Sequence, residues 1–562
     1  MIIVGINYYF EHSSVSIIKD GVLVFSAEEE RFNGIKGGKR YSPFSVQIPF
    51  RALYESLKYL DITIADVDAI SISYNKWHHL IGLLSKRWSY YDDFYALRGQ
   101  FHFRRILCSE YERYQYMSDR LSMKGLKTVP LLYYDHRLSH AASAFCYSGF
   151  NDSLVLVADC CGERSCTSIY HMSTSGTKLL KTFPIPHSLG LFYSIVTKHL
   201  GFNTFQDEYK VMGLASYGNI SYIDVFKNIV TYDNRGHYRV NERNLFNLAS
   251  FLGPARLPNE PITQTHKDIA RTAQFIIEDI LIHLLRYYGN KYNLTNLCMA
   301  GGVALNCVAN GRIADAGIFD SIYVQPASSD AGTSMGAAAL AYMRLGGEHY
   351  IKCDDMYLGT EYSNEHIKKV LDGSKIKYHY YDDRELARIV AIESSKGNVG
   401  GVFRGRMEAG PRALGNRSVI ASPLSKEMLP MINEIKGREM FRPIAPIVLE
   451  ERFDDFFEGM PNRYMLFTCK VKESVKNIVP AITHVDGTSR VQTVTKDTNS
   501  FMYNTLEEFE DITGVPILIN TSLNFRGKPI VESPAEAVAQ FYASGLDYLV
   551  IGNYLLRKEW NQ

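Results

Sequence analysis

The chain has 562 residues, too many for one ordinary hydrophobic core, so we expect two or more large domains. Hydrophobic residues make up 46% of it and charged residues 22%, which is typical of a folded soluble protein. The formal net charge of +1 argues against a nucleic-acid partner, because proteins that bind polyanions usually carry a basic excess.

No apolar run approaches the length that spans a bilayer, and the stretch Met1–Asn7 lacks the basic region of a signal peptide. We therefore expect a cytoplasmic protein with no membrane partner. The nine cysteines are odd in number and form no C-x-x-C pair, which argues against a disulfide framework and a structural zinc site.

Residues 2–27 predict a strand followed by a hairpin. Ile2–Asn7 is apolar, Ser14–Ile18 partly alternates, and a Lys-Asp-Gly turn leads into a strand at Val22–Ala27. A strand, a polar loop and a hairpin open the ribonuclease-H-like ATPase fold. A second start of the same kind stands at Ser153–Asp159, so the pattern indicates an internal repeat.

Residues 75–125 interleave aromatic side chains with arginines, a combination that can bind single-stranded nucleic acid. With so small a net charge, we favour a packed helical insertion or a subunit contact for this segment.

Two histidines, His136 and His140, are spaced so that a helix places both imidazoles on one face, within reach of one ion. This spacing alone also arises by coincidence. Asp159 ends the predicted strand of the second repeat, and Asp330 stands in a glycine-rich loop before an alanine-rich stretch. Two histidines and two aspartates with open positions suit Fe(II), Mn(II) or Zn(II).

Residues 267–345 alternate helix, strand and glycine loop, which predicts α/β architecture with ligand loops at strand ends. Gly301 and Gly302 open one such loop, and Asn306 in it is placed to bond a ribose or a base. Asp207 and Glu208 begin a polar-then-glycine segment of the kind that lines an acceptor site. A role as simple turn residues is an equal alternative for Asn306 and for this segment.

The composition changes within 345–360, which predicts domains at 1–350 and 351–562. The second domain mixes helix and strand. Its last helix begins with a capping box at Ser533–Glu536, and Tyr548–Leu556 predicts one final strand.

Three arginines and three glycines crowd the segment Gly405–Arg417. Arginine forks bind phosphate or carboxylate oxygens, and glycines let a backbone come close to a ligand. Such a loop is typical of a site for an anion with several oxygens, of which nucleotide phosphates are the first candidates; a solvated basic turn is the alternative.

Taken together, these motifs resemble those of the O-carbamoyltransferases of the nodulation-protein and antibiotic-tailoring group, over essentially the whole chain. Members of this group carbamoylate nodulation factors, aminoglycosides, cephems and ansamycins. The stretches that carry the resemblance are Ala27–Phe32, His136–Ala141, Asp207–Ala215, Ala300–Asn306, Ser329–Gly332, Gly410–Gly415 and Asn520–Gly527.

The resemblance implies an α/β protein with a Kae1-like N-terminal domain of the ribonuclease-H-like ATPase fold and a YrdC-like C-terminal domain. It implies that the C-terminal domain makes carbamoyl-adenylate from carbamoyl phosphate and ATP, with Mg²⁺ assisting. The N-terminal domain then passes the carbamoyl group to a small-molecule alcohol with the help of a bound metal, usually iron. The implied metal ligands are His136, His140, Asp159 and Asp330. The residues expected to hold carbamoyl phosphate and the adenylate are Arg412, Arg417, Arg442, Arg490, Asn524 and Arg526.

One position departs from the family, which usually reads His-Asp-Ser in the first turn, where this chain has Phe10-Glu11-His12-Ser13. Three interpretations remain open for the base that deprotonates the alcohol. His12 reaches the site through a local shift, Glu11 serves as base, or the metal and proximity suffice. We favour His12, because histidine is the side chain that ordinarily exchanges protons near neutral pH.

Two other functions use the same modules or fold. Threonylcarbamoylation of tRNA needs a tRNA-binding surface, against which the small net charge argues. A nucleotide-regulated switch or scaffold that has lost turnover is compatible with the altered first turn. The acceptor is expected to be a hydroxyl of a natural product or sugar, shaped by residues 75–125 and 207–240, and a homodimer is compatible with the sequence.

Overall fold

The computed structural model of the protein describes residues 1–8, 11–38, 48–75 and 129–561. The predicted aromatic insertion lies, from residue 76 on, outside the described residues. The described chain forms two compact units, Met1–Asp354 and Asp355–Gln562. The first unit thus ends inside the stretch where the composition of the sequence changes.

The first unit opens with a five-stranded sheet of order β3-β2-β1-β4-β5. Strands β1, β2 and β3 form an antiparallel meander, and β4 and β5 run parallel to β1 on its other side. Its strands are β1 (Ile2–Asn7), β2 (Ser14–Lys19), β3 (Val22–Glu28), β4 (Ala69–Ile72) and β5 (Leu131–Tyr133).

The second sheet of this unit has the same topology, with order β12-β11-β6-β7-β8. Its first strand is again central, with an antiparallel meander on one side and two parallel strands on the other. The repeat predicted from the sequence is therefore confirmed, and with it an ATPase-like first domain. The strands are β6 (Asp152–Ala158), β7 (Thr167–Ser173), β8 (Gly176–Phe183), β11 (Asn296–Ala300) and β12 (Ser321–Val324).

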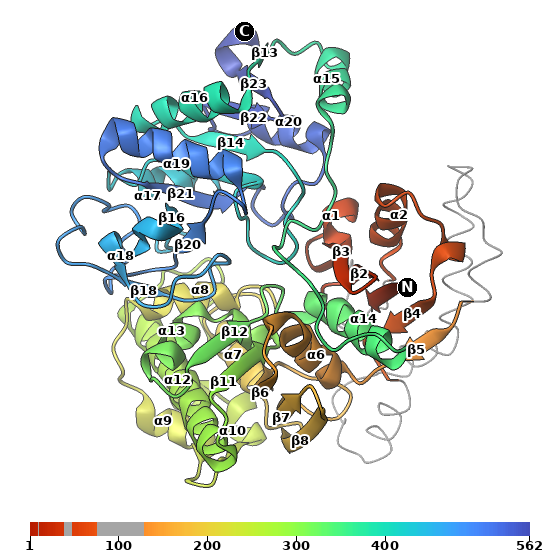
Figure 1. The fold of residues 1–562 in the computed structure, drawn as a ribbon. Coiled ribbons are helices and arrows are strands. Elements are labelled where there is room, and N and C mark those ends of the chain that lie inside the picture. The colour runs from red at the N-terminus through yellow and green to blue at the C-terminus, as the bar shows by residue number, and fades with distance from the viewer. Residues whose placement is uncertain (9–10, 39–47, 76–128, 562) are drawn as a thin grey trace. The chain divides into compact units, whose positions relative to one another are not determined.

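Two helices, α6 (His136–Ser148) and α14 (Thr333–Arg344), pack against each other between these sheets (Figure 1). Helix α6 also contacts β6 and β11, and α14 contacts β1 and β2. The close crossing depends on Gly336, because a Cβ there would lie 1.7 Å from the carbonyl oxygen of Ser139. The start of α6 and the loop before α14 are thereby held near one another.

The other elements of this unit divide between the two repeats. Helices α1 and α2 contact the sheet of the first repeat. The long helix α12 contacts the second repeat and buries the apolar side predicted for residues 267–288. Helix α12 packs against α7, α8, α9 and α13. These elements are α1 (Glu29–Asn33), α2 (Phe50–Tyr59), α7 (Leu189–His199), α8 (Glu208–Ala215), α9 (Ile223–Lys227), β9 (Val230–Tyr232), β10 (Tyr238–Val240), α10 (Glu242–Phe246), α11 (Ala249–Leu252), α12 (Gln264–Tyr292) and α13 (Cys307–Asp315), with short turns η1 (Lys36–Gly38), η2 (Ile64–Asp66), η4 (Gly302–Leu305) and η5 (Asp330–Gly332).

The second unit is built on an eight-stranded mixed sheet of order β13-β23-β22-β14-β15-β21-β16-β20, beside a small sheet of order β17-β18-β19. The strands are β13 (His379–Tyr380), β14 (Gly400–Phe403), β15 (Arg417–Ala421), β16 (Ala445–Leu449), β17 (Phe457–Glu458), β18 (Cys469–Val471), β19 (Thr488–Ser489), β20 (Gln492–Val494), β21 (Ile517–Ser522), β22 (Tyr548–Ile551) and β23 (Tyr554–Arg557).

Helices cover both faces of the large sheet. Side chains of α16 and α19 share one buried core with alternate strand residues such as Val402 and Leu518. Side chains of α15, α17 and α20 share another with Phe403 and Ile517. The helices and turns are α15 (Asn364–Gly373), α16 (Asp383–Ser395), α17 (Met428–Ile435), η6 (Glu450–Arg452), α18 (Phe453–Phe456), α19 (Ser500–Thr513), α20 (Pro534–Tyr542) and η7 (Lys558–Asn561).

The C-terminal end both confirms and corrects the sequence prediction. Helix α20 begins with the predicted capping box between Ser533 and Glu536. The single final strand is wrong, because β22 and β23 pair antiparallel as a hairpin. Its turn is Gly552-Asn553, and Gly552 has a positive φ of 55°, which favours reversal of the chain at this point.

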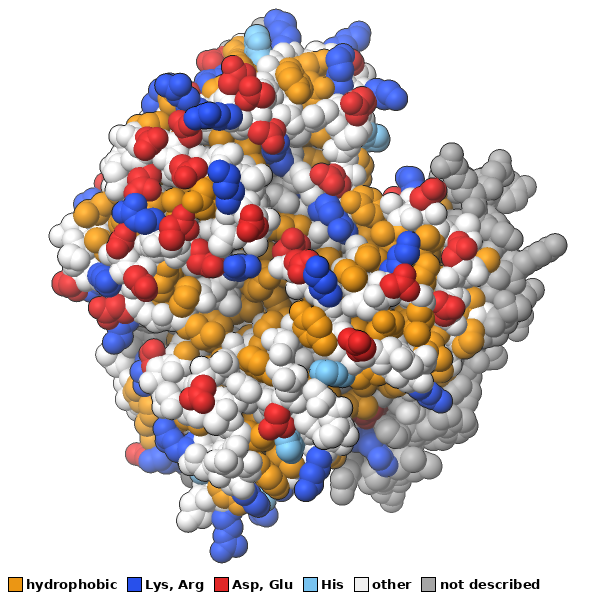
Figure 2. Space-filling view, in the orientation of Figure 1, with side chains coloured by type: hydrophobic (Ala, Val, Ile, Leu, Met, Phe, Trp, Pro, Cys, Tyr) orange, Lys and Arg blue, Asp and Glu red, His pale blue; other side chains and the backbone are white. Residues whose placement is uncertain are grey.

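Acidic and basic side chains are interspersed over the described residues on the face seen in Figure 2. This mixture agrees with the net charge of +1 for the whole chain. Among the described residues, the helices are all too short or too polar to cross a lipid bilayer.

Candidate functional site

Helix α6 places the two predicted histidine ligands on one face. Asp135 caps its start by accepting hydrogen bonds from the backbone N–H groups of Arg137 and Leu138, at 3.0 and 3.1 Å. His136 and His140 are fully buried, and their ring centroids lie 4.7 Å apart. The predicted helical spacing is therefore confirmed, with both imidazoles in the interior.

The carbonyl of Ser73 orients the first imidazole. Nδ1 of His136 lies 3.2 Å from this oxygen, which directs the other ring nitrogen, Nε2, toward the two aspartates. A histidine held in this way through one nitrogen offers the other to a metal.

Asp159, after the end of β6, and Asp330, at the start of η5, complete a compact cluster. Nε2 of His136 and Nε2 of His140 lie 3.4 and 3.3 Å from Oδ1 of Asp330. The same nitrogens lie 3.8 and 3.7 Å from Oδ2 of Asp159. One potential ligand atom from each of the four residues lies within 4.8 Å of the others. The structure thus brings the four predicted ligands together.

Backbone groups fix both carboxylates. The N–H of Gly302 donates to Oδ1 of Asp159 at 3.3 Å, and the N–H of Glu11 donates to Oδ2 of Asp330 at 2.9 Å. The glycine loop of the second repeat and the first turn of the chain therefore both reach the cluster.

The donor set fits a divalent metal. Both ring nitrogens of His140 are buried and have no hydrogen-bond partner among the described residues, a costly state that a metal ligand would relieve. Burial lowers the pKa of His136, but Asp330 and Asp159 outweigh it and raise that pKa to about 10. The carboxylates that attract this proton would attract a cation in its place.

In the second unit, the predicted anion-binding residues converge at one edge of the large sheet. Arg412, Arg442 and Arg490 stand shortly before the starts of β15, β16 and β20. Asn524 and Arg526 follow the end of β21, which runs antiparallel to β15 and β16, while β20 runs parallel to β16. The starts of three strands and the end of the fourth therefore meet at this edge.

Hydrogen bonds tie the arginine loop to its neighbouring strands. Oε1 of the buried Glu408 accepts from the backbone N–H groups of Leu414, Asn416 and Arg417, at 2.8 to 3.0 Å. The carbonyl of Leu414 accepts from the amide of Gln492 on β20 at 2.8 Å. These hydrogen bonds fix the loop that carries Arg412.

Two further charged residues organise the other side of this edge. Oε2 of Glu439 lies 3.7 Å from Nη1 of Arg442, and its Oε1 lies 3.3 Å from Nη2 of Arg526. Glu439 therefore links the two arginines. Lys436 donates to Oδ1 of Asn524 at 2.8 Å and to the carbonyl of Ser522. Burial, and then Arg438 and Arg442, hold the pKa of Lys436 well below its usual value. The edge therefore carries an excess of cationic groups.

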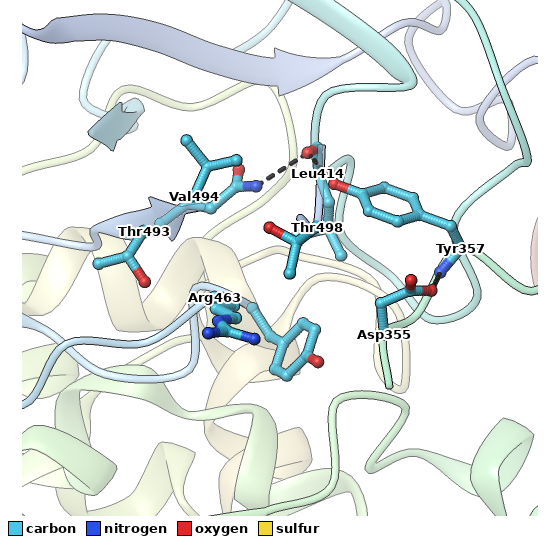
Figure 3. Close-up of a pocket in the computed structure, with 9 residues that line it drawn as sticks. Asp355, Tyr357, Leu414, Arg463, Thr493, Val494 and Thr498 are labelled. Carbon is cyan, nitrogen blue, oxygen red and sulfur yellow. Dashed lines mark hydrogen bonds between the residues drawn. The ribbon is translucent and has the colours of Figure 1, made fainter. Parts of the chain in front are cut away.

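A small pocket of the second unit adjoins the same loop (Figure 3). The hydroxyl of Tyr357 donates to the carbonyl of Leu414 at 2.8 Å on its wall. Its cationic member, Arg463, pairs with Glu450 at 3.2 Å. The lining residues are Asp355, Tyr357, Leu414, Arg463, Tyr464, Gln492, Thr493, Val494 and Thr498.

Comparison with known proteins identifies the family of the whole chain. Residues 2–339 match the family described as Carbamoyltransferase N-terminus, and residues 391–558 match Carbamoyltransferase C-terminus. The chain belongs to the carbamoyltransferase family. It is an enzyme of carbamoyl transfer, as its resemblance to the nodulation group predicted.

Individual relatives extend over most of this carbamoyltransferase. It is 35% identical over 580 residues to the nodulation protein NolNO of Sinorhizobium fredii, covering 98% of this chain and 80% of that protein. It is 40% identical over 442 residues to the nodulation protein NolO of Bradyrhizobium diazoefficiens, and the match covers 75% of this chain and 79% of that protein. An uncharacterized protein of Synechocystis is 37% identical over 608 residues, covering 99% and 96%.

Solved structures are more distant. Component A of the (R)-2-hydroxyglutaryl-CoA dehydratase of Acidaminococcus fermentans matches 61% of the carbamoyltransferase and 98% of its own chain, with 14% identity and a TM-score of 0.32. Full-length HypF in its phosphate- and nucleotide-bound form matches 62% and 56%, with 10% identity and a TM-score of 0.34.

The predicted nucleotide residues of the first unit have structural partners. A Cβ on Gly301 would lie 2.3 Å from the carbonyl oxygen of Ala158, so this position needs glycine. Asn306 caps α13 by accepting from the N–H of Ala309 at 3.0 Å, and its amide exchanges hydrogen bonds with Gln274. These contacts fit the alternative in which Asn306 is a turn residue, here one that caps a helix.

The predicted acceptor residues are also held by local bonds. Asp207 pairs with Lys210 at 3.1 Å. Glu208 accepts from the Ser194 hydroxyl at 2.5 Å and from the Phe205 N–H at 2.6 Å. Burial raises the pKa of Glu208, and these hydrogen bonds oppose that shift.

Arg417 differs from the other arginines in the predicted anion set. It is fully buried, and its guanidinium donates to the carbonyl oxygens of Arg404, Gly405 and Thr360, at 2.8 to 3.3 Å. With no exposed surface, it cannot meet a phosphate in this state. We therefore correct its predicted role to that of a structural arginine that holds the loop closed.

The first turn carries both candidate bases, and Glu11 contacts the candidate metal cluster. Glu11 donates its backbone N–H to Asp330, and the side chains of Glu11 and His12 are half-buried. The next residue, His12, has a positive φ of 52°. The side chain of Asn7 donates to the carbonyls of Glu11 and His12, at 2.8 and 3.1 Å, which fixes this turn.

Sequence reasoning passed over three charged residues of these sites. Arg137 was hidden because it stands between two histidines and was not assigned to either class of ligand. Glu408 was hidden among arginines, although an acidic residue inside a basic loop is a signal. Lys436 is, in sequence, only the start of a basic segment, and its contact with Asn524 joins residues far apart in the chain.

Proposed function

We propose that this carbamoyltransferase is an ATP-dependent O-carbamoyltransferase that works through carbamoyl-adenylate. Water releases phosphate from carbamoyl phosphate and leaves carbamate. A carbamate oxygen attacks the α-phosphorus of ATP, and pyrophosphate leaves. The hydroxyl oxygen of the acceptor then attacks the carbamoyl carbon, AMP leaves, and the hydroxyl proton passes to a base.

The convergence of cations at one sheet edge of the second unit carries this proposal. Carbamoyl phosphate and ATP together bring many negative oxygens, which repel one another unless cations surround them. Arg412, Arg442, Arg490 and Arg526 would hold these oxygens, with Asn524 orienting the reactants and Mg²⁺ assisting. Lys436 and Glu439 would keep this set in place, because they bond Asn524 and both Arg442 and Arg526.

The cluster in the first unit supports the transfer step. His136, His140, Asp159 and Asp330 would hold Fe(II) or another divalent metal, because this donor set and its burial suit such an ion. When bound, the metal supplies positive charge that favours the phosphate of the adenylate and the departure of AMP.

The base would come from the first turn. We favour His12, and Glu11 is the alternative, because the turn is tied to Asp330 and hence to the metal cluster. Asp207 and Glu208 would lie toward an acceptor that is a hydroxyl of a natural product or sugar.

The decisive experiment measures release of pyrophosphate from ATP by the full chain, with and without carbamoyl phosphate. We expect release only when carbamoyl phosphate is present, and its loss in Arg526→Ala. Asp372→Ala, at an exposed pair with Lys368 elsewhere in the unit, is the matched control and should keep the wild-type rate. Binding of ATP without any pyrophosphate release would contradict the proposal and favour a nucleotide switch.

A further inference from the structure

Arg137, the residue after His136, belongs to neither predicted ligand set, yet its side chain contacts the candidate metal cluster. The side chain is 2% exposed, and Nη1 donates to Oδ2 of Asp159 at 2.8 Å. Nε donates to the carbonyl of Ser165 at 3.0 Å. Nη2 is buried and has no hydrogen-bond partner among the described residues. A fixed positive charge thus stands beside the predicted metal ligands.

Gly162, in the loop between β6 and β7, makes room for this guanidinium. A Cβ on Gly162 would lie 2.8 Å from Nε and 3.1 Å from Cζ of Arg137. The next residue, Glu163, accepts from the backbone N–H of His136 at 3.1 Å and from that of Asn75 at 2.8 Å. The loop and the start of α6 therefore hold Arg137 between them.

Arg137 donates to the carboxylate oxygen of Asp159 that faces the candidate metal cluster. Oδ2 is the oxygen of Asp159 that lies 3.8 and 3.7 Å from Nε2 of the two histidines, and it is also the oxygen that accepts from Arg137. The other oxygen, Oδ1, accepts from Gly302. Arg137 therefore fixes the rotation of this carboxylate and draws negative charge away from the oxygen that faces the cluster.

We propose that Arg137 is a positioning residue that shifts the metal centre toward binding anions. By sharing Oδ2 of Asp159 with the ion, it weakens the hold of the centre on a divalent cation. The same positive charge strengthens the hold of the loaded centre on a phosphate group. This inference rests on the proposed function, because it assumes an ion on the four ligands.

Arg137 is thus expected to lower the affinity for the cation and to raise the affinity for phosphate. These opposite effects distinguish an electrostatic role from a merely structural one. An arginine that only holds the fold would, when replaced, weaken the binding of cation and anion together. If the arginine instead sets the charge of the centre, its replacement by a neutral side chain would strengthen cation binding and weaken anion binding.

The test uses the full chain with Co²⁺ as the metal and inorganic phosphate as the anion. Competition with a chelator gives the Co²⁺ affinity. Phosphate is then titrated into the loaded protein and followed through the visible absorption of Co²⁺, which responds to changes at the ion and not to phosphate bound elsewhere.

Three variants define the outcome. Arg137→Met removes the charge and keeps much of the side-chain length. Gly162→Ala keeps the charge and displaces it. The matched control is Arg256→Met, since Arg256 is another buried arginine of the same unit, whose guanidinium donates to the carbonyls of Leu200 and Glu260.

In Arg137→Met we expect Co²⁺ to bind more tightly and phosphate more weakly, each by the roughly 10- to 100-fold typical of outer-sphere changes at metal sites. Gly162→Ala should shift both affinities in the same directions by less, and Arg256→Met should leave both unchanged. If Arg137→Met does not fold, the Co²⁺ and phosphate affinities of Gly162→Ala test the inference instead.

A parallel loss of both affinities, or no change in either, would overturn the inference. A wild-type chain that takes up no Co²⁺ would overturn it as well, while leaving the pyrophosphate test of the proposed function unaffected. Opposite shifts in a protein that releases no pyrophosphate would support the role of Arg137 and contradict the adenylate step.

Discussion

The two candidate sites of this carbamoyltransferase differ in how their charged side chains are arranged. In the first unit, opposite charges are paired in the interior, where Nη1 of Arg137 lies 2.8 Å from Oδ2 of Asp159 and both histidines are fully buried. In the second unit, like charges gather at a sheet edge, and the side chain of Arg526 is 66% exposed. There, Glu439 is shared between two arginines.

This difference indicates what each site can bind. A buried cluster of two histidines and two carboxylates, with Arg137 beside it, is suited to a small cation, whose charge can then attract an anion. A half-exposed edge with an excess of arginines is suited to a large anion that arrives with its own water. We therefore expect the first unit to bind an anion through a bound cation, and the second unit to bind anions directly through its arginines.

The largest expected effect comes from removing a ligand of the buried cluster. In His140→Ala the four-ligand set is broken, so we expect acceptor carbamoylation to fall below detection while carbamoyl phosphate-dependent pyrophosphate release persists. Parallel assays of both products, with metal content measured on the same sample, check this. Loss of both products would contradict the assignment of the two steps to different units.

The first turn offers the next test. In His12→Ala we expect transfer to the acceptor to fall by roughly 10²- to 10⁴-fold, the usual contribution of a general base, with pyrophosphate release unchanged. Glu11→Gln is the paired variant, and its transfer rate should change much less. The reverse ranking would assign the base to Glu11, and undiminished transfer in both would leave deprotonation to the metal and proximity.

At the sheet edge, Arg442→Ala removes one cation from the proposed anion site. We expect pyrophosphate release to slow by roughly 10²- to 10³-fold, as when one donor to a developing charge is removed. The metal affinity of the first unit should not change. A loss of metal in this variant would show that the two charge systems are not independent.

The sequence predicted much of both sites because their residues follow strand ends or share a helix face. The repeat, the HxxxH helix and the glycine loops were readable in this way, and the four ligands do meet. Arg417 was misjudged because a list of arginines does not reveal burial. The contacts of Arg137 with Asp159 and of Lys436 with Asn524 depend on tertiary packing, which local patterns do not encode. The likeness of the second unit to YrdC remains a prediction.

The smallest effect concerns a buried carboxylate of the first unit that lacks the pairing seen at Asp159. Burial raises the pKa of Glu29 to about 7, and hydrogen bonds from the backbone of Ala52 and Arg51 oppose the shift only in part. For Asp159, burial also raises the pKa, but Arg137 and the two histidines outweigh it and bring that pKa well below its usual value. Glu29 therefore tests whether a neighbouring cation, such as Arg137 beside Asp159, is what allows a buried carboxylate of this unit to stay charged.

Because the folded pKa of Glu29 lies above the unfolded value, its protonated form stabilises the fold at low pH, and this contribution is lost as pH rises through about 7. The loss amounts to at most ~3.5 kcal/mol of unfolding free energy, at about 1.4 kcal/mol per pKa unit. Glu29→Gln keeps one acceptor oxygen and removes the titration. Denaturant unfolding of both proteins from pH 5 to pH 8 should show the variant gaining stability relative to the wild type as pH rises. A difference that is constant with pH would mean that Glu29 is charged throughout, and that burial without a cation costs this unit little.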